Sequence, residues 1–343
     1  MTNDKRLDWL QAQPDGCLLL APSGVHFVMV EKSQSVIRVA LIDRDYLTSD
    51  LVQSQLDFND PFNLISPYSQ AMLLSLVWQP QPKRIYCVGF GGGRIPSVLH
   101  HYFPHVQIEC TEIEPLLIEI ATEFFGVPFD ERLKVTLQDG RDYLAKQEPD
   151  VCYDIIFTDA IIGNGYTPYR LATQEFYQLC QNHLSENGVL AVNLFQRERF
   201  YADKVKTIQA VFAQVYLFPL DVGNTVVLAT NSPPLNLPEI LERIQVLQND
   251  HQFAFPLSET AVQVKIGSRL IECIPQLDRA KVLVDAEPPV GYFDDLPSFN
   301  PLFAQGISDR PCPCGSGQLF QACHSRLTAN CQPSTVETSE SSS

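Results

Sequence analysis

Four glycines within five residues form the first candidate site. The apolar run Ile85–Val88 ends in Gly89, Gly91, Gly92 and Gly93, and sequence of helical character follows at once. This order predicts a buried strand that turns sharply into a helix whose first N–H groups face a ligand. Glycine is needed there because a Cβ would hold the ligand away from the backbone. Such turns bind nucleoside ligands in many α/β folds, so this one alone fixes neither cofactor nor reaction.

Three acidic residues follow the next predicted strands. Glu112, near the end of the second strand, could accept both hydroxyls of a ribose, or be an exposed acid at a strand end. Asp139, followed by Gly140, could accept a hydrogen bond from an adenine amino group, cap the next helix, or do both. Asp159 ends the fourth strand. A carboxylate there could stabilise a sulfonium cation or accept a proton from an attacking amine, or it could cap the following loop.

A second candidate site lies near the C-terminus. The pattern C-x-C-x8-C-H offers three thiolates and one imidazole, supplied by Cys312, Cys314, Cys323 and His324. Four protein ligands would complete a tetrahedral structural Zn²⁺ site and leave no position for catalysis. Because so short a segment cannot bury a core, metal binding would supply its folding energy. The alternative is a tail with accidental cysteines.

The elements that would position the first site alternate between strand and helix. This spacing predicts a mostly parallel sheet covered on both faces. Asp221–Asn224 joins two further strands as a hairpin. A closing hairpin, and Arg94 where a dinucleotide fingerprint needs its last glycine, favour a Rossmann-like α/β fold of the methyltransferase type. The predicted parallel strands are 85–88, 106–113, 133–137, 154–158 and 189–194.

The chain divides into five predicted parts. A β-rich domain (1–78) precedes the α/β domain (79–235), and a helical or irregular extension (236–305) follows, with expected helices at 238–248 and 259–274. This extension could be a lid, a dimer contact or packing only. The zinc module (306–331) and a disordered tail (332–343) complete the chain.

The composition of the chain limits which kinds of partner it is expected to bind. The 343 residues carry a net charge of −16, which argues against nucleic acid as the main partner. No apolar run approaches the roughly 20 residues of a membrane span. The first residues carry acids where a signal peptide would have basic and then apolar residues. We therefore expect a cytoplasmic protein that binds neither nucleic acid nor membrane.

The motifs together resemble the spermidine synthase (polyamine aminopropyltransferase) family. The resemblance covers roughly residues 25–230. It implies a class I S-adenosylmethionine-dependent methyltransferase fold with a small N-terminal sheet, usually dimeric, that transfers aminopropyl from decarboxylated S-adenosylmethionine to a diamine. The segments that carry it are Ile85–Gly93, Thr111–Pro115, Leu137–Leu144, Tyr153–Asp159, Glu175–Tyr177 and Leu184–Leu190.

By position, the resemblance also implies roles for single residues. Glu112 matches the ribose-binding acid and Asp139 the adenine-contacting acid. Asp159 matches the catalytic carboxylate, and Gln53 matches a glutamine at the edge of the active site. The glycine turn, with Gly89, Gly91 and Gly93, and Gly140 would complete the donor site.

Two acids of the family pattern are replaced. Gly92 stands where the family has an acid that holds the aminopropyl ammonium, and Ile162 stands where a second acid helps to hold the amine acceptor. A hydrogen bond to a charged group is worth about 1.5–3 kcal/mol, so both losses weaken polyamine chemistry unless other acids substitute. Arg94 could complement the α-carboxylate of ordinary S-adenosylmethionine, which the decarboxylated donor lacks, or it could point to solvent.

The cysteine cluster resembles the SEC-C motif, found at the tail of the preprotein translocase motor ATPase and appended to many other proteins. In the translocase that tail contacts a chaperone and the ribosome, which implies a docking module here. Three functions therefore compete: aminopropyl transfer to an amine acceptor, methyl transfer, and a non-catalytic adenosyl-ligand-binding protein that docks a partner through its zinc module. The first is the leading hypothesis.

Overall fold

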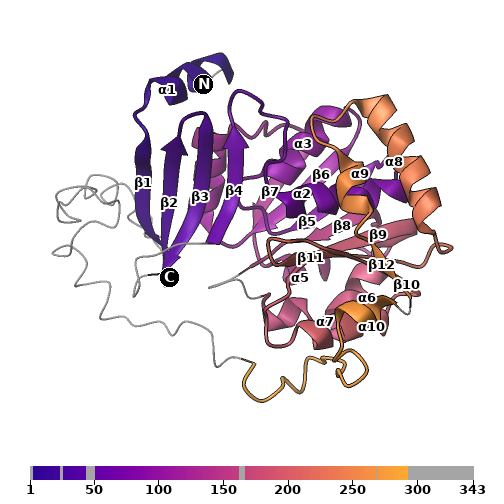
Figure 1. Cartoon of the computed structure of the whole chain (residues 1–343). Coiled ribbons are helices and arrows are strands. Elements are labelled where there is room, and N and C mark those ends of the chain that lie inside the picture. Colours follow the sequence, from indigo (N-terminus) through magenta and orange to yellow (C-terminus); the bar gives the residue numbers. More distant parts are fainter. Residues whose placement is uncertain (1–2, 24–25, 44–50, 162–166, 268, 293–343) are drawn as a thin grey trace, which may run out of the picture.

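Two sheets lie next to each other in the computed structural model, which describes residues 3–23, 26–43, 51–161, 167–267 and 269–292 (Figure 1). The smaller sheet is antiparallel, and helix α1 (Asn3–Ala12) precedes it. Apolar residues alternate along its strands, so that Val28, Val30, Ile37 and Val39 join the main core. Its strands, in spatial order, are β1 (Gly16–Ser23), β2 (His26–Ser33), β3 (Val36–Asp43) and β4 (Leu51–Asp57).

The larger sheet has eight strands in the order β12-β10-β11-β9-β8-β5-β6-β7. Strands β5 to β9 pair in parallel, and β11, β10 and β12 add antiparallel pairs at one side. The expected parallel sheet with a closing hairpin is therefore confirmed. Its strands are β5 (Arg84–Val88), β6 (Gln107–Glu112), β7 (Leu133–Leu137), β8 (Tyr153–Thr158), β9 (Leu184–Phe195), β10 (Gln214–Pro219), β11 (Asn224–Thr230) and β12 (Lys265–Ile266).

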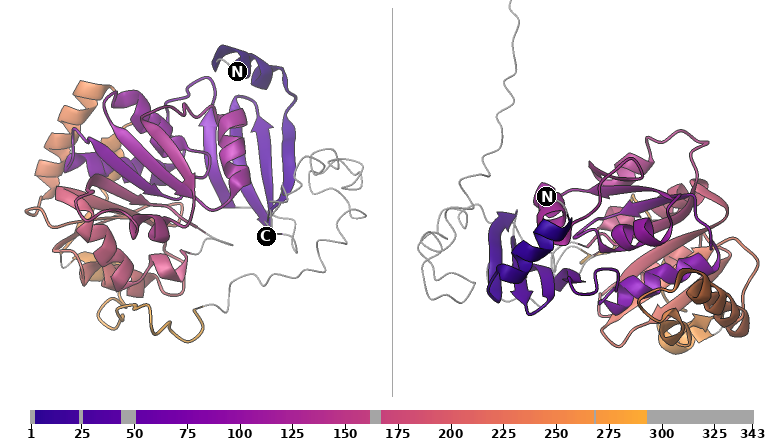
Figure 2. Two further views of the ribbon diagram at one scale, coloured as in Figure 1. Left: turned by 180° about the vertical axis from the view of Figure 1, so that it is seen from behind. Right: turned by 90° about the horizontal axis from the view of Figure 1, so that it is seen from above.

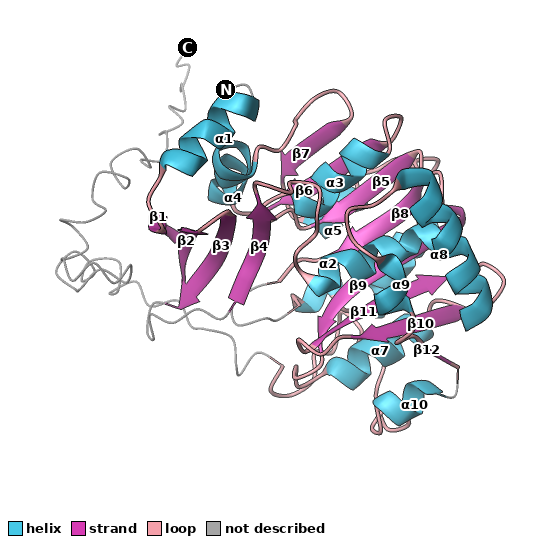
Figure 3. Ribbon diagram, turned by 45° about the horizontal axis from the view of Figure 1, so that its top comes forward, coloured by secondary structure: helices cyan, strands magenta, loops and turns pink. Residues whose placement is uncertain are grey.

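Helices cover both faces of this sheet (Figure 3). Because neighbouring side chains of a strand point to opposite faces, Ile85 and Cys87 pack in one core, whereas Tyr86 and Val88 pack in the other. The first face carries α2 (Pro67–Met72), the 3-10 turn Leu73–Val77, α3 (Arg94–Tyr102), α4 (Pro115–Ile120), α8 (Leu237–His251) and α9 (Leu257–Ala261). The second carries α5 (Gly140–Leu144), α6 (Gln174–Asn182), α7 (Tyr201–Gln209) and α10 (Arg269–Cys273).

The smaller sheet stands beside the carboxyl ends of the parallel strands (Figure 2). Helix α2 contacts β9 and β11 of the larger sheet, although it lies within the predicted N-terminal domain. Helix α8 begins with a capping box between Asn236 and Glu239 and packs on the 3-10 turn. None of the helices in the described part of the chain is long and apolar enough to cross a membrane.

The single helix expected over 259–274 is wrong. Two five-residue helices, α9 and α10, occupy this region, and β12 lies between them. Tyr216 and Leu217 of β10 pair with Ile266 and Lys265, so sheet pairing competes with the helix there. Gly267 then turns the chain with a φ of +60°. The edge of the larger sheet therefore overrides the local helical pattern.

A buried ion pair joins α7 to the loop before it. Lys204 and Glu198 have side chains only 0% and 3% exposed, and Glu198 also accepts the N–H of Thr167. Burial raises the pKa of Glu198 and lowers the pKa of Lys204, while the ion pair opposes both shifts. Each charge therefore depends on its partner.

Replacing only the cation should destabilise the fold. We expect Lys204→Met to lower the free energy of unfolding by about 3–5 kcal/mol, because it leaves a buried carboxylate unpaired. Lys204→Met combined with Glu198→Gln should recover much of that loss, since a neutral amide can still accept from Thr167. Chemical denaturation measures both variants. A single variant as stable as the wild type would contradict this account of the pair.

Candidate functional site

A cavity of about 700 Å³ opens where the two sheets meet. Parallel strands β5, β6 and β8 direct their carboxyl ends into it, which is where open α/β sheets bind ligands. The smaller sheet contributes Gln53 and Ser54, and α2 contributes Tyr68. The sequence-predicted residues that line the cavity are Gln53, Gly89, Gly91, Arg94, Glu112, Asp139, Gly140 and Asp159.

The glycine turn has the conformation that its sequence predicts. Gly89, Gly91 and Gly93 have φ values of +90°, +55° and +68°, a region that favours glycine. A Cβ on Gly89 would lie 2.7 Å from the backbone oxygen of Asp159, so the turn closely approaches the end of β8. Gly93 does not line the cavity: it is the N-cap residue of α3 and packs beside Phe90.

Gly92 has no room for a side chain. Its N–H donates to Ser54 Oγ over 2.9 Å, and a Cβ would lie 2.7 Å from Ser54 Cβ and 3.1 Å from the Phe125 ring. The acid implied by the family pattern at this position therefore does not fit while β4 stays in place. The absence of an acid at position 92 therefore goes together with the close contact between Gly92 and Ser54 of the smaller sheet.

Glu112 holds the turn to the end of β6. One carboxylate oxygen accepts the N–H groups of Phe90 and Gly91, each over 3.1 Å. The other accepts from Ile113 and Glu114, over 2.8 and 3.1 Å. The side chain thus fixes the shape of the turn from within the cavity wall. Its contact with a ribose stays a prediction.

Asp139 is the N-cap of α5, so the capping alternative is confirmed. Its carboxylate accepts the N–H of Asp142 over 3.0 Å and lies 3.6 Å from Arg170 Nη1. Gly140 permits the helix to approach the sheet, because a Cβ there would lie 2.5 Å from Val88. Both residues line the cavity, and their contact with an adenine stays a prediction.

Asp159 is held by an amide chain that extends across the antiparallel strands. Asn193 Nδ2 donates to Asp159 Oδ1 over 2.8 Å, and Asn224 Nδ2 donates to Asn193 Oδ1 over 2.9 Å. Burial raises the pKa of Asp159 to about 6, although hydrogen bonds from Asn193 and Tyr68 oppose the shift. A carboxyl group with that pKa can accept or return a proton near neutral pH.

Tyr68, Asn193 and Asn224 were absent from the sequence-based site. The hydroxyl of Tyr68 lies 3.4 Å from the backbone oxygen of Gln53, beside β4, and also faces Asp159, so its one hydrogen has two possible acceptors. A polar amide inside the apolar strand 189–194 is a signal that could have pointed to Asn193. The partners of Tyr68 and Asn224 become visible only in the folded chain.

Arg94 does not point to solvent. It is 8% exposed, its Nη2 donates to the backbone oxygen of Pro61, and its Nε has no hydrogen-bond partner in the described structure. It makes no ion pair with a carboxylate of the described residues. Burial lowers the pKa of Arg94 to about 10, with a further contribution from Arg6. A buried cation of this kind fits an anionic ligand group.

The predicted zinc ligands Cys312, Cys314, Cys323 and His324 lie outside the described residues, as does Ile162, which stands at the position of the second replaced acid. Within the described part, no group of three His, Cys, Asp or Glu side chains is arranged as a metal site.

Two family models match the sequence. The spermine/spermidine synthase domain matches residues 68–222, and the SEC-C motif matches residues 311–326. The eEF1A lysine and N-terminal methyltransferase of Homo sapiens is 32% identical over 209 residues, which are 55% of this chain and 30% of that longer protein. The solved structure of human methyltransferase-like protein 13 in complex with SAH is 29% identical, with a TM-score of 0.51, and covers 55% of this chain and 93% of its own.

The match to a further relative covers most of that relative's length. The polyamine aminopropyltransferase of Chromobacterium violaceum is 31% identical over 209 residues, which cover 58% of this chain and 76% of the relative. The residues matched by the spermine/spermidine synthase domain include the strands that carry the glycine turn and Asp159. The chain therefore belongs to the spermine/spermidine synthase family of transferases.

Proposed function

We propose that the chain transfers an alkyl group from an S-adenosylmethionine-type donor to an amine, with Asp159 as the general base. One observation carries this proposal: a cavity carboxylate at the end of β8 has a pKa raised to about 6 and is oriented by Asn193. The relatives support the acceptor class, because one is named for polyamines and another for protein lysines and N-termini. The neighbour solved with SAH supports an adenosyl donor.

The cavity residues suggest how the donor would lie. The turn at Gly89 and Gly91 would face the donor with backbone rather than side chains, Glu112 would receive the ribose, and Asp139 and Gly140 would border the adenine. All five residues line one cavity. The sulfonium of the donor would then lie toward Asp159, beside the close approach of Gly89 to β8.

The proposed reaction is a nucleophilic displacement at carbon. The amine lone pair attacks the carbon bonded to the sulfonium, the C–N bond forms and the C–S bond breaks, and the electron pair stays on sulfur as a thioether. The ammonium so formed loses its proton to Asp159. Because the pKa of this carboxyl is about 6, the base form dominates above that pH and is lost below it.

Aminopropyl transfer is the first candidate reaction, as in the family relative. The cavity offers little for a second ammonium group, however. Its described carboxylates are Glu112, Glu114, Asp139 and Asp159. Glu112 and Asp139 accept backbone N–H groups, and Glu114 accepts the Leu116 N–H and the Ser23 hydroxyl. Only Asp159 has no backbone N–H donor among the described contacts, so the other three carboxylates would share their oxygens between these bonds and an ammonium group.

Methyl transfer is the second candidate, and Arg94 favours it. A buried arginine without a carboxylate partner in the described structure is costly unless a ligand supplies the anion. The α-carboxylate of ordinary S-adenosylmethionine is such a group, and the decarboxylated donor lacks it. We propose Arg94 as the residue that distinguishes the two donors.

The C-terminal module has a separate proposed role. Cys312, Cys314, Cys323 and His324 would hold one structural Zn²⁺, and the folded module would dock a protein partner. The match to the SEC-C motif supports this assignment. A homodimer, which is usual for proteins that the sequence resembles, also stays a proposal.

The transfer itself is tested by product mass. Wild-type protein is incubated with putrescine and with either donor, and the products are separated by mass spectrometry. We expect an aminopropylated or a methylated amine, a rate that falls as the pH drops through about 6, and a loss of about 10²–10⁴-fold in Asp159→Asn. Lysine peptides extend the acceptor panel. An Asp159→Asn variant as fast as the wild type would contradict the assigned base.

Arg94 is tested by calorimetry with both donors. We expect Arg94→Met to weaken binding of S-adenosylmethionine by roughly 10-fold or more, in line with the loss of a hydrogen bond to a charged group. Binding of the decarboxylated donor should change little. If the substitution acted only through the lost contact with Pro61, binding of both donors would weaken equally. Tighter binding of the decarboxylated donor by the wild type would exclude this role for Arg94.

Zinc is tested by metal analysis of the full chain. We expect one zinc ion per chain, and a clear loss of zinc in Cys314→Ser, because that variant leaves three ligands. Cys152→Ser is the matched control, since this exposed cysteine lies outside the motif. Metal-free wild-type protein that stays unchanged after added zinc would contradict the assignment.

A further inference from the structure

Residues 281–292, called the strap below, contact α7, the first residue of α6 and the residues that precede α6. Three hydrogen bonds fix the backbone of the strap to the helices. The Lys281 N–H donates to Asp203, the Leu283 N–H donates to Thr207, and the Leu283 carbonyl accepts from Gln174. Leu283 is 1% exposed. These contacts make the strap a fixed part of the domain, far along the chain from the elements that it touches.

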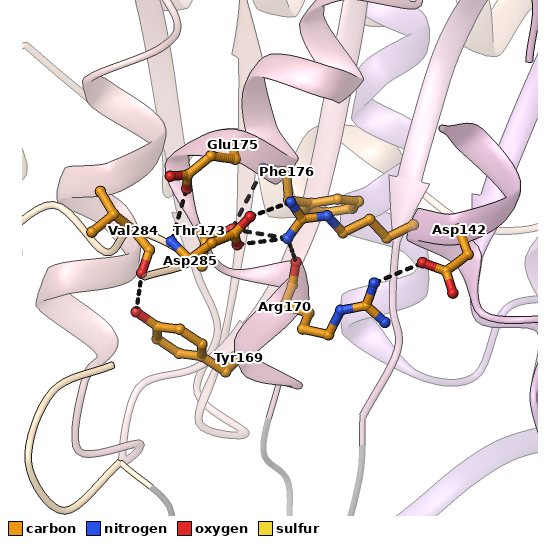
Figure 4. A network of polar contacts seen from close by, with 9 residues as sticks. Asp142, Tyr169, Arg170, Thr173, Glu175, Phe176, Val284 and Asp285 are labelled. Atoms are coloured by element: carbon orange, nitrogen blue, oxygen red, sulfur yellow. Dashed lines mark hydrogen bonds and ion pairs between the residues drawn. The ribbon is translucent and has the colours of Figure 1, made fainter. Parts of the chain in front are cut away.

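Asp285 of the strap forms the centre of a polar network (Figure 4). Its two oxygens accept from Arg141 Nη1 and Nη2 over 2.7 and 2.5 Å, and Oδ1 also accepts the hydroxyl of Thr173 over 2.7 Å. The Asp285 N–H donates to Glu175 over 3.0 Å. The Arg141 guanidinium lowers the pKa of Asp285, so the carboxylate stays charged at neutral pH.

The same arginine reaches the wall of the cavity. Arg141 Nη1 donates to the backbone oxygen of Arg170 over 2.9 Å. Arg170 then extends back to Asp142, over 2.6 Å, and to Asp139, at 3.6 Å. Asp139 lines the cavity, as do Pro168 and Leu171 on either side of Arg170. Residues 167–172, called the wall segment below, thus lie between the strap and the proposed adenine end.

The strap also contacts the wall segment at two further points. The Tyr169 hydroxyl donates to the Val284 carbonyl over 2.6 Å, and the Tyr292 hydroxyl donates to the Thr167 carbonyl over 3.1 Å. The rings of Tyr169 and Tyr292 pack edge to face, with centroids 4.7 Å apart. The strap therefore holds the wall segment at its start, its middle and, through Arg141, at Arg170.

We propose that Asp285 is a positioning residue for donor binding: by holding Arg141, it fixes the wall segment against Asp139 and sets how tightly the cavity closes on the adenosyl group. The identity of the ligand rests on the proposed function, whereas the mechanical link rests on the contacts alone. An isolated, partly exposed ion pair contributes little. This one is bidentate, has a third partner in Thr173, and acts through the order of a segment that lines the site.

Calorimetry and hydrogen exchange test the link in the full chain. Asp285→Asn should weaken binding of S-adenosylhomocysteine at least 5-fold and speed amide exchange in residues 167–173. Glu31→Gln is the matched control: Glu31 pairs with Arg38 over 2.5 Å in the smaller sheet, with a side chain 28% exposed against 40% for Asp285, and neither residue of this pair hydrogen-bonds to the wall segment in the described structure. The control should leave both readouts unchanged.

A second variant distinguishes a local effect on the wall segment from general unfolding of the protein. Tyr169→Phe removes only the hydroxyl that bonds Val284, and it should give the same local exchange pattern more weakly. Unchanged exchange and affinity in both variants would overturn the proposal. If wild-type protein does not bind S-adenosylhomocysteine, the proposed donor is wrong, while the exchange of residues 167–173 still decides whether the strap holds the wall segment.

Discussion

The carboxylate of Glu112 is the contact on which the geometry of the site depends. Four backbone N–H groups, two from the glycine turn and two from the residues after β6, donate to its two oxygens. These bonds hold the turn in a left-handed conformation and bring Gly89 against Asp159. The cavity has its shape because this turn cannot move away from the strand ends.

The smaller sheet completes the cavity and also limits its chemistry. Ser54 of β4 accepts from Gly92 and occupies the space that a side chain there would need. Tyr68, on the helix that follows, contacts Asp159 from the same side. The sheets therefore share one site, and a change in the glycine turn has to be matched by a change in β4.

The parallel strands were predictable because strands buried on both faces appear as uninterrupted apolar runs. Glu112, Asp139 and Asp159 could be predicted as neighbours because each lies at or just after the carboxyl end of one of these strands. Strand β4 is hard to predict from sequence because Gln53, Ser54 and Gln55 are polar and line the cavity. The region 259–274 was misjudged because pairing with β10 is a long-range contact.

The hydrogen-bond partners of the site were less accessible to prediction. Asn193 meets Asp159 across two neighbouring strands, and Arg94 is buried by a loop more than 30 residues earlier in the chain. The strap that carries Asp285 meets Arg141 after a separation of 144 residues. Such contacts depend on how the elements pack. Local residue patterns can single out Asn193 as a polar residue in an apolar strand, but they do not identify the partners of these side chains.

Binding of 5′-methylthioadenosine to the full chain tests the central claim most directly. Both proposed donors contain the same adenosyl group and 5′-sulfur, although their sulfur is a charged sulfonium and that of 5′-methylthioadenosine is a neutral thioether. Calorimetry should show one site per chain, and S-adenosylhomocysteine should compete for it. The assignment of the cavity as an adenosyl site would be contradicted if the wild-type protein binds neither compound and neither compound changes its thermal stability.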